Sequence, residues 1–200
     1  MRKPLILAAL LVFPLAPLCA QSVVLDNARV RAIATTRSAL APLGRRTTGV
    51  VIPLRDTSDR KAGDAFWATE AALPEDAGEA GRVPVVIIEP KDAAASPAPP
   101  NATPPGGAQF TGMSFTPIFE NDKVRVLRAR MEAGASEGLH THGSDTVVVH
   151  LSGGEIEDTA NGKTVVNRWK PGDVEFEARG SSHSARNVGK PIDVVLVALK

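Results

Sequence analysis

The sequence has little of several residue types that mark particular classes of protein. It holds one cysteine, Cys19, in 200 residues, which excludes an intramolecular disulfide, a CxxC redox pair and a cysteine-rich zinc site. Aromatic residues make up 4% of the chain and tyrosine is absent, so few side chains can stack on sugars or bases. The net charge of +1 gives no basic excess for a phosphate backbone. We therefore expect no nucleic-acid partner.

Long apolar runs are also scarce, and the longest lies at the start of the chain. Residues 1–20 begin with the basic pair Arg2 and Lys3, continue as an apolar run broken by prolines, and end in small residues. This pattern predicts a cleaved secretory signal peptide, and hence a secreted or periplasmic protein. The run is shorter than the roughly 20 residues of a membrane span, so no span is expected. A lipid anchor on Cys19 is the alternative, which the bulky Leu18 before it disfavours.

Proline, alanine and glycine gather at one place, residues 91–108, which predicts an extended linker. The linker separates a module of residues 21–90 from a domain of residues 109–200. Segments on its two sides align as a degenerate internal repeat: LDNARVRAIATT starting at Leu25 with FENDKVRVLRAR starting at Phe119, then VVIPL with VVVHL, then KAGDAFW with KPGDVEF. Between the last two blocks the first half has six residues where the second has eighteen. We infer that the two halves share an arrangement of strands and that the first half lacks one hairpin.

The domain of residues 109–200 has the pattern of an all-β unit. Strands rich in branched apolar or alternating residues are expected at 124–131, 146–151, 155–159, 163–169, 174–177 and 192–199. The pair Asn161-Gly162 predicts a tight hairpin turn between two of them. Short strands at regular spacing predict a sandwich or barrel, because closure hides strand edges.

Two short motifs in this domain resemble those of the cupin family. They are GLHTH (138–142) with LSG (151–153), and Gly172 with ARG (178–180), His183 and Asn187. The resemblance covers about residues 119–200. It implies a small cupin-type β-barrel (a double-stranded β-helix, or jelly roll), with the first half as a shorter, β-rich, cupin-like unit in a bicupin-like chain.

The same resemblance implies a metal site. Its ligands would be His140, His142 and His183, and its cofactor one divalent transition metal, iron, manganese, zinc, nickel or copper. The family places a glutamate ligand four residues after the second histidine, where this chain has Thr146. Three imidazoles plus water remain a competent shell, and some cupin oxygenases have a three-histidine iron site.

Strand alternation assigns further residues to the pocket. It places Thr146 and His150 on the same face as His140 and His142. We expect His150 to be a hydrogen-bonded interior residue rather than a ligand, since buried polar groups find partners first. Asp145 is the remaining pocket candidate, although alternation directs it to the opposite face. Tryptophans are interpreted as packing residues.

The first half has lost every one of these ligands. Under the alignment, Arg46 and Thr48 stand where His140 and His142 stand, and prolines replace the other two histidines. Either this half is a shortened repeat kept for packing, or it is an unrelated β-rich module with an acidic loop at residues 75–79.

Two classes of function remain at this stage. The first is an exported metalloprotein whose three histidines hold a metal that acts on a small molecule, as a dioxygenase- or isomerase-like enzyme. The second is a non-catalytic binding or structural module with a vestigial site. Catalytic residues, substrate and oligomeric state, including a homodimer, stay open.

Overall fold

The computed structural model describes residues 21–36, 48–69 and 83–200 as two antiparallel β-sheets. The predicted signal peptide with Cys19, part of the first half of the repeat (37–47) and the acidic loop at 75–79 lie outside the described residues. No helix in the described part of the chain is long and apolar enough to cross a membrane. The all-β prediction is confirmed for these residues.

The first sheet has the strand order β1-β2-β5-β3-β4. Its strands are β1 (Ser22–Asp26), β2 (Val30–Thr36), β3 (Gly49–Pro53), β4 (Phe66–Ala68) and β5 (Pro84–Pro90). β5 lies at its centre, and its valines and isoleucines are buried on both faces, as in a strand covered on two sides.

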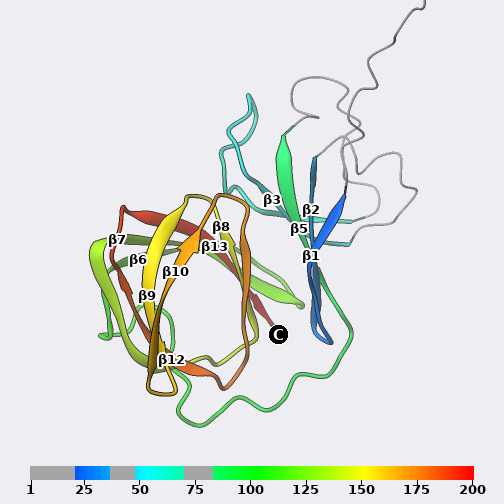
Figure 1. Ribbon diagram of the computed structural model, residues 1–200. Coiled ribbons are helices and arrows are strands. Elements are labelled where there is room, and N and C mark those ends of the chain that lie inside the picture. The colour runs from blue at the N-terminus through cyan, green and yellow to red at the C-terminus, as the bar shows by residue number, and fades with distance from the viewer. Residues whose placement is uncertain (1–20, 37–47, 70–82) are drawn as a thin grey trace, which may run out of the picture.

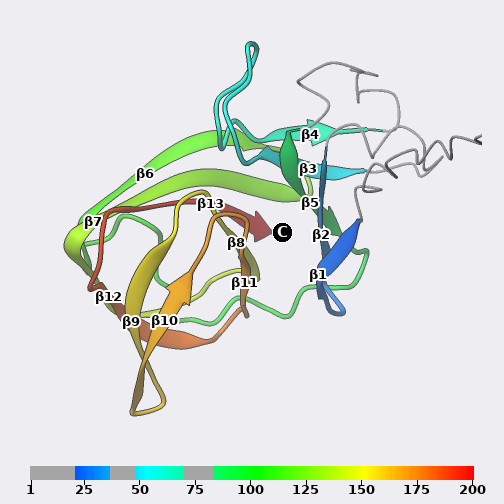
Figure 2. The same ribbon diagram turned by 45° about the horizontal axis from the view of Figure 1, so that its top comes forward.

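The second sheet curls into a barrel, beside which the first sheet packs (Figures 1 and 2). Its strand order is β10-β9-β12-β7-β13-β8-β11, and β6 also pairs with β7. The strands are β6 (Phe110–Glu120), β7 (Val124–Thr141), β8 (Thr146–His150), β9 (Gly154–Ala160), β10 (Lys163–Trp169), β11 (Val174–Glu177), β12 (Ser182–Asn187) and β13 (Ile192–Leu199). The jelly-roll expectation for this half is confirmed.

β7 determines how the barrel closes. Its first part pairs with β13, from Val124 to Met131, and its last part pairs with β12, up to Thr141. A register shift in the β12 pairing marks an irregularity in this region, and such bulges bend a strand and re-aim its side chains. Sequence patterning found only the first part of β7, because the second part, EAGASEGLHT, lacks regular alternation.

The predicted hairpin turn is confirmed. β9 and β10 pair with Ala160 opposite Lys163, which leaves two residues in the loop. Asn161 has φ 52° and Gly162 has φ 73°, the left-handed values that a type I′ turn requires at both positions.

Strand order repeats between the two sheets. The order β1-β2-β5-β3-β4 matches β6-β7-β13-β8-β11, and the pair Val30 and Pro90 matches the pair Val124 and Leu199. β9, β10 and β12 have no counterpart among the described strands of the first half, as the shorter gap between its sequence blocks predicts.

Turns repeat as well, down to individual hydrogen bonds. Asn27 Oδ1 accepts from the backbone N–H of Val30 at 3.0 Å, and Asn121 Oδ1 accepts from that of Val124 at 2.9 Å. In the KxGD turns, Asp64 and Asp173 each accept from the backbone N–H three residues earlier at 2.7 Å. Matching side chains make matching turns, which supports the internal repeat.

The two sheets share one hydrophobic core. It contains Val30, Val50 and Ile52 of the first sheet and Val124, Val147 and Val149 of the second, which correspond under the repeat. Arg128 also joins the halves, since it forms a two-point ion pair with Asp193 and donates to the carbonyl of Ala62 at 3.1 Å. The opposite face of the barrel sheet is left free to line a cavity.

Candidate metal centre

The barrel encloses a cavity of about 490 Å³. Most of its wall is apolar and comes from Met113, Leu127, Met131, Val148, Ile156, Trp169, Val194 and Leu196. Four histidines and five acidic side chains also line it. The predicted linker contributes too: residues 102–105 lie at the cavity, and the backbone N–H of Thr103 donates to the carbonyl of Thr141 at 2.9 Å.

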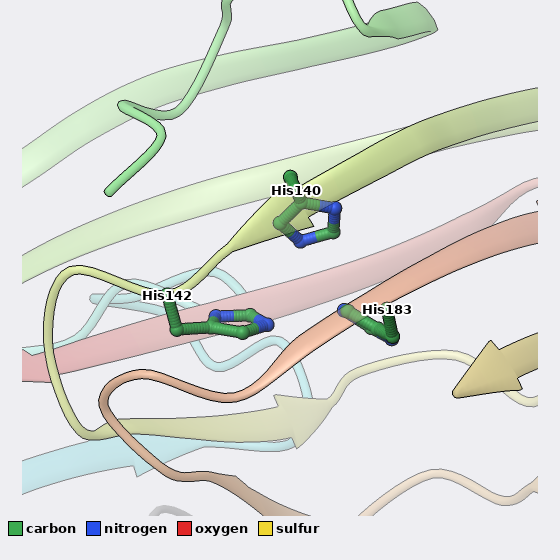
Figure 3. A group of neighbouring side chains, drawn as sticks. All are labelled: His140, His142 and His183. Carbon is green, nitrogen blue, oxygen red and sulfur yellow. The ribbon is translucent and has the colours of Figure 1, made fainter. Parts of the chain in front are cut away.

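Three histidines converge at one end of this cavity (Figure 3). His140 lies near the end of β7 and pairs across the sheet with His183 of β12, so both rings stand on one face. His142 follows β7 and is held by two backbone hydrogen bonds, to Ser181 and from Gly180. The ring centroids are 4.5 to 5.0 Å apart, and one nitrogen of each ring lies within 4.8 Å of the others.

Two of these rings have one nitrogen engaged and the other free. His140 Nδ1 lies 3.0 Å from the carbonyl oxygen of Gly138, and His183 Nδ1 lies 2.7 Å from Asp158 Oδ1. In neutral rings these contacts fix the proton on Nδ1 and leave Nε2 as a lone-pair donor. His183 Nε2 is buried and has no hydrogen-bond partner in the described structure. An acceptor that fixes the far nitrogen of a ligating histidine is the usual arrangement around a metal.

Burial favours the neutral form of His140 and His142. It lowers the pKa of His140, and it lowers the pKa of His142 from 6.5 to about 4, with a further contribution from the neighbouring imidazoles. Neutral imidazole is the form that ligates metals, so these shifts favour coordination at neutral pH.

Two glutamates border the three rings. Glu177 Oε2 lies 3.4 Å from His142 Nδ1, and Glu137 Oε2 lies 3.9 Å from the Nε2 atoms of both His140 and His183. Burial raises the pKa of both carboxyls, that of Glu177 strongly, and nearby carboxylates raise it further. A divalent ion among the rings would supply positive charge that favours the ionised forms.

Glu177 also brings a carboxylate to the place where the first cupin motif of this chain lacks its glutamate. It sits directly opposite Thr146 in the pairing of β11 with β8, so a carboxylate reaches the site from the neighbouring strand. Thr146 itself lines the cavity, where its hydroxyl donates to the carbonyl of Ser144.

His150 lies elsewhere in the same cavity. Its ring is 1% exposed and stacks on Trp169, with centroids 4.6 Å apart and planes 16° apart. Its Nε2 is 3.9 Å from Glu175 Oε2, and neither ring nitrogen has a hydrogen-bond partner in the described structure. His150 is therefore an interior residue, as expected, but the expectation that it is hydrogen-bonded is wrong.

The structure corrects the interpretation of Asp145 as a pocket residue. Its carboxylate faces away from the cavity, accepts from Arg29 Nε at 2.9 Å and accepts from the backbone N–H of Arg179 at 2.9 Å. The reason is strand alternation, since its neighbour Thr146 takes the cavity face. Asp145 holds the two halves together instead.

Sequence reasoning missed the four acidic residues that lie within 3.9 Å of the cavity histidines, Glu137, Asp158, Glu175 and Glu177. Alternation in β11 gave a signal for two of them, because Glu175 and Glu177 must share a face. Glu137 and Asp158 carried no such signal, since they reach the site through the irregular pairing of β7 with β12 and through β9.

No protein-family model matches the sequence, and no curated protein does. Solved structures with a similar fold do exist. They include a cupin domain from Bordetella pertussis, with 24% identity over 47% of this chain and 99% of that one and a TM-score of 0.42. A cupin superfamily protein from Desulfitobacterium hafniense has 17% identity over 54% of this chain and 98% of that one, with a TM-score of 0.38.

A third is described as a predicted oxalate decarboxylase from Thermotoga maritima, with 29% identity over 44% of this chain and 81% of that one and a TM-score of 0.35. Cupin-domain proteins are thus among the structural neighbours of this chain, and cupins are the family that its two histidine motifs resemble.

Proposed function

We propose that this chain binds one divalent transition metal ion through His140, His142 and His183, and uses it on a small molecule that enters the barrel. The carrying observation is the buried Nε2 of His183, which lacks a partner while Asp158 engages the other nitrogen of the ring. A buried polar atom left unpaired is costly, and a metal ion among the three clustered rings would give it a partner.

The donor set narrows the metal. Neutral imidazoles suit iron, nickel, copper and zinc better than magnesium or calcium, which prefer oxygen ligands. A bound ion of this kind would supply Lewis-acid or oxygen-activating chemistry. The chain's own residues orient the rings, favour the neutral forms of His140 and His142, and enclose the site in a largely apolar cavity.

Metal analysis of tag-free protein tests this proposal. We expect about one ion per chain, and an affinity at least about 10- to 100-fold lower in His140→Ala and His183→Ala, a scale taken from weaker perturbations of metal sites. His150→Phe is the matched control, because it removes a histidine of the same cavity outside the three-ring group. Equal affinity in all four proteins, or no bound metal in any, would favour the non-catalytic module.

We further propose that residues 1–20 are removed during export. The basic start, the short apolar run and the small residues before Gln21 support this. Mass spectrometry of the protein made in its own cell type would give a mature chain starting at Gln21. A chain retaining residues 1–20, or a lipid on Cys19, would refute it.

A further inference from the structure

The cavity has a second polar end, formed by His150, Trp169 and Glu175. His150 follows Thr146 by four residues on β8, so the Cα atoms of the two are about 13 Å apart at the usual strand rise. Glu175 precedes Glu177 by two residues on β11, on the same face. Thr146 and Glu177 mark the end with the three-histidine group, and His150 and Glu175 lie farther along the same wall.

His150 needs a partner that the protein does not provide. Both its nitrogens are buried and unpaired in the described structure, and the nearest carboxylate oxygen, on Glu175, stands 3.9 Å away. That gap is too wide for a hydrogen bond. The ring lines the cavity, and its stacking on Trp169 fixes its plane. A partner must therefore come from the cavity itself.

The charges around the cavity restrict what that partner is. Five acidic side chains line it: Glu120, Glu137, Asp158, Glu175 and Glu177. The lining has two cations, Arg125 and Lys200, and both are half exposed and paired with Glu120, at 2.9 and 2.8 Å. An anionic ligand would find no free cation among the described lining residues, apart from a metal ion at the other end.

The walls between the two polar ends are apolar, so a ligand that fits them has an apolar middle part. Leu127, Val148 and Leu196 lie on adjacent strands of the wall, and Trp169 extends the apolar surface at the His150 end. Burying apolar ligand area against them is favourable. A cavity of about 490 Å³ has room for a molecule the size of two fused rings.

We propose that the cavity takes an uncharged, mostly apolar small molecule with a hydroxyl or carbonyl group at each end, and that His150 binds the group remote from the three histidines. The part concerning the opposite end rests on the proposed metal site. Glu175 acts as a selectivity residue, because its carboxyl disfavours an anionic group beside His150.

A pair of matched probes tests this inference on the full chain, with and without bound zinc. The probes are a dihydroxynaphthalene and the naphthalene dicarboxylate with the same substitution pattern, and calorimetry measures their binding. We expect the diol to bind at least about 10-fold more tightly than the dicarboxylate. We expect His150→Phe, which keeps the ring stacked on Trp169, to weaken the diol about 10-fold. Glu175→Gln should raise the affinity for the dicarboxylate.

Each outcome decides the matter. Failure of the diol to bind, equal binding of the two probes, or unchanged diol affinity in His150→Phe overturns the inference. Zinc stoichiometry, measured on the same samples, separates this result from the proposed function. If zinc binds and His150→Phe has no effect, only the inference fails; if zinc does not bind and His150→Phe still weakens the diol, only the metal proposal fails.

Discussion

Replacing His150 with phenylalanine should make the metal-free protein more stable. His150 is 1% exposed, and both its ring nitrogens are buried without hydrogen-bond partners in the described structure. A buried polar group left unpaired costs about 1–3 kcal/mol. The centroids of the His150 and Trp169 rings are 4.6 Å apart. Phenylalanine keeps an aromatic ring in this stacked position and removes both polar nitrogen atoms. The cavity of about 490 Å³ has room for water, which would satisfy part of this cost, so we expect a gain of about 1 kcal/mol.

Asn187→Leu provides the matched comparison, because Asn187 is also 1% exposed but fully satisfied. Its Nδ2 donates to the carbonyls of Met131, Glu132 and Lys190 at 3.2, 3.0 and 2.8 Å. Its Oδ1 accepts from the backbone N–H of Gly189 at 2.9 Å. Losing these four hydrogen bonds should cost about 4 kcal/mol, at about 1 kcal/mol for each bond.

Urea unfolding followed by circular dichroism, without metal, compares both variants with the parent chain. For a protein of this length a gain of about 1 kcal/mol corresponds to a Tm about 2–4 °C higher. The m-values must agree, so that the midpoints report stability alone. A His150→Phe protein as destabilised as Asn187→Leu would show that His150 is a structural residue and would refute the reasoning.

Three further predictions concern the three-histidine end of the cavity. Asp158→Asn should lower metal affinity about 10- to 100-fold, because it weakens the contact that orients His183. Titration against a chelator measures the metal affinity, and an unchanged affinity would mean that Asp158 does not orient His183 for metal binding. Glu177→Gln should lower metal affinity by about 10-fold or more, since Glu177 brings a negative charge to within 3.4 Å of His142; an unchanged zinc isotherm would contradict this. The metal-free protein should lose stability as the pH falls from about 6.5 towards 4. Burial lowers the pKa of His142 to about 4, so the unfolded chain binds a proton at this residue more tightly than the folded chain does. Urea unfolding of His142→Gln should show a smaller loss of stability over this pH range, and an equal loss would assign the effect to other groups.

The buried glutamate acts on stability in the opposite direction. Burial raises the pKa of Glu177, so the folded chain holds that proton more tightly than the unfolded chain does. This contribution is present at low pH and is lost as the pH rises through the raised pKa. Metal binding with Glu177 ionised would release the proton, so metal affinity should increase with pH over that range.

Local patterning predicted those parts of the barrel in which each strand obeys alternation. The bounds of β10, β11 and β13 agree with the sequence reading residue for residue, because branched apolar residues and the turn at Asn161-Gly162 mark their ends. β6 and β12 were not predicted. Their sequences, FTGMSFTPIFE and SHSARN, mix small and polar residues, and pairing with β7 decides their conformation.

The site shows the same division between local and long-range information. The resemblance of two motifs to those of cupins implied His140, His142 and His183 as ligands, and the structure brings them together. The carboxyl groups around them could not be assigned, because Asp158 and Glu177 meet the rings through cross-strand register. Register depends on the whole barrel and not on a local pattern.

The internal repeat explains why the described part of the first half has no cavity as large as that of the second half. The cavity residues Leu127, Val148, Val194 and Leu196 correspond to Ile33, Val51, Val85 and Ile87 of the first sheet. There the same face is a compact hydrophobic cluster, with each of the four at most 1% exposed.

The hairpin β9–β10 and strand β12, which wall off the cavity in the second half, have no described counterpart in the first. Without that wall, metal-ligating side chains on this face would not lie in an enclosed cavity. The first sheet's opposite face instead covers the barrel through Val30, Val50 and Ile52. Its equivalent of His150 is Pro53, a residue that has no side-chain nitrogen to leave unpaired. The first half therefore stabilises the barrel from outside, and the unpaired histidine nitrogens lie in the half whose cavity can give them a partner.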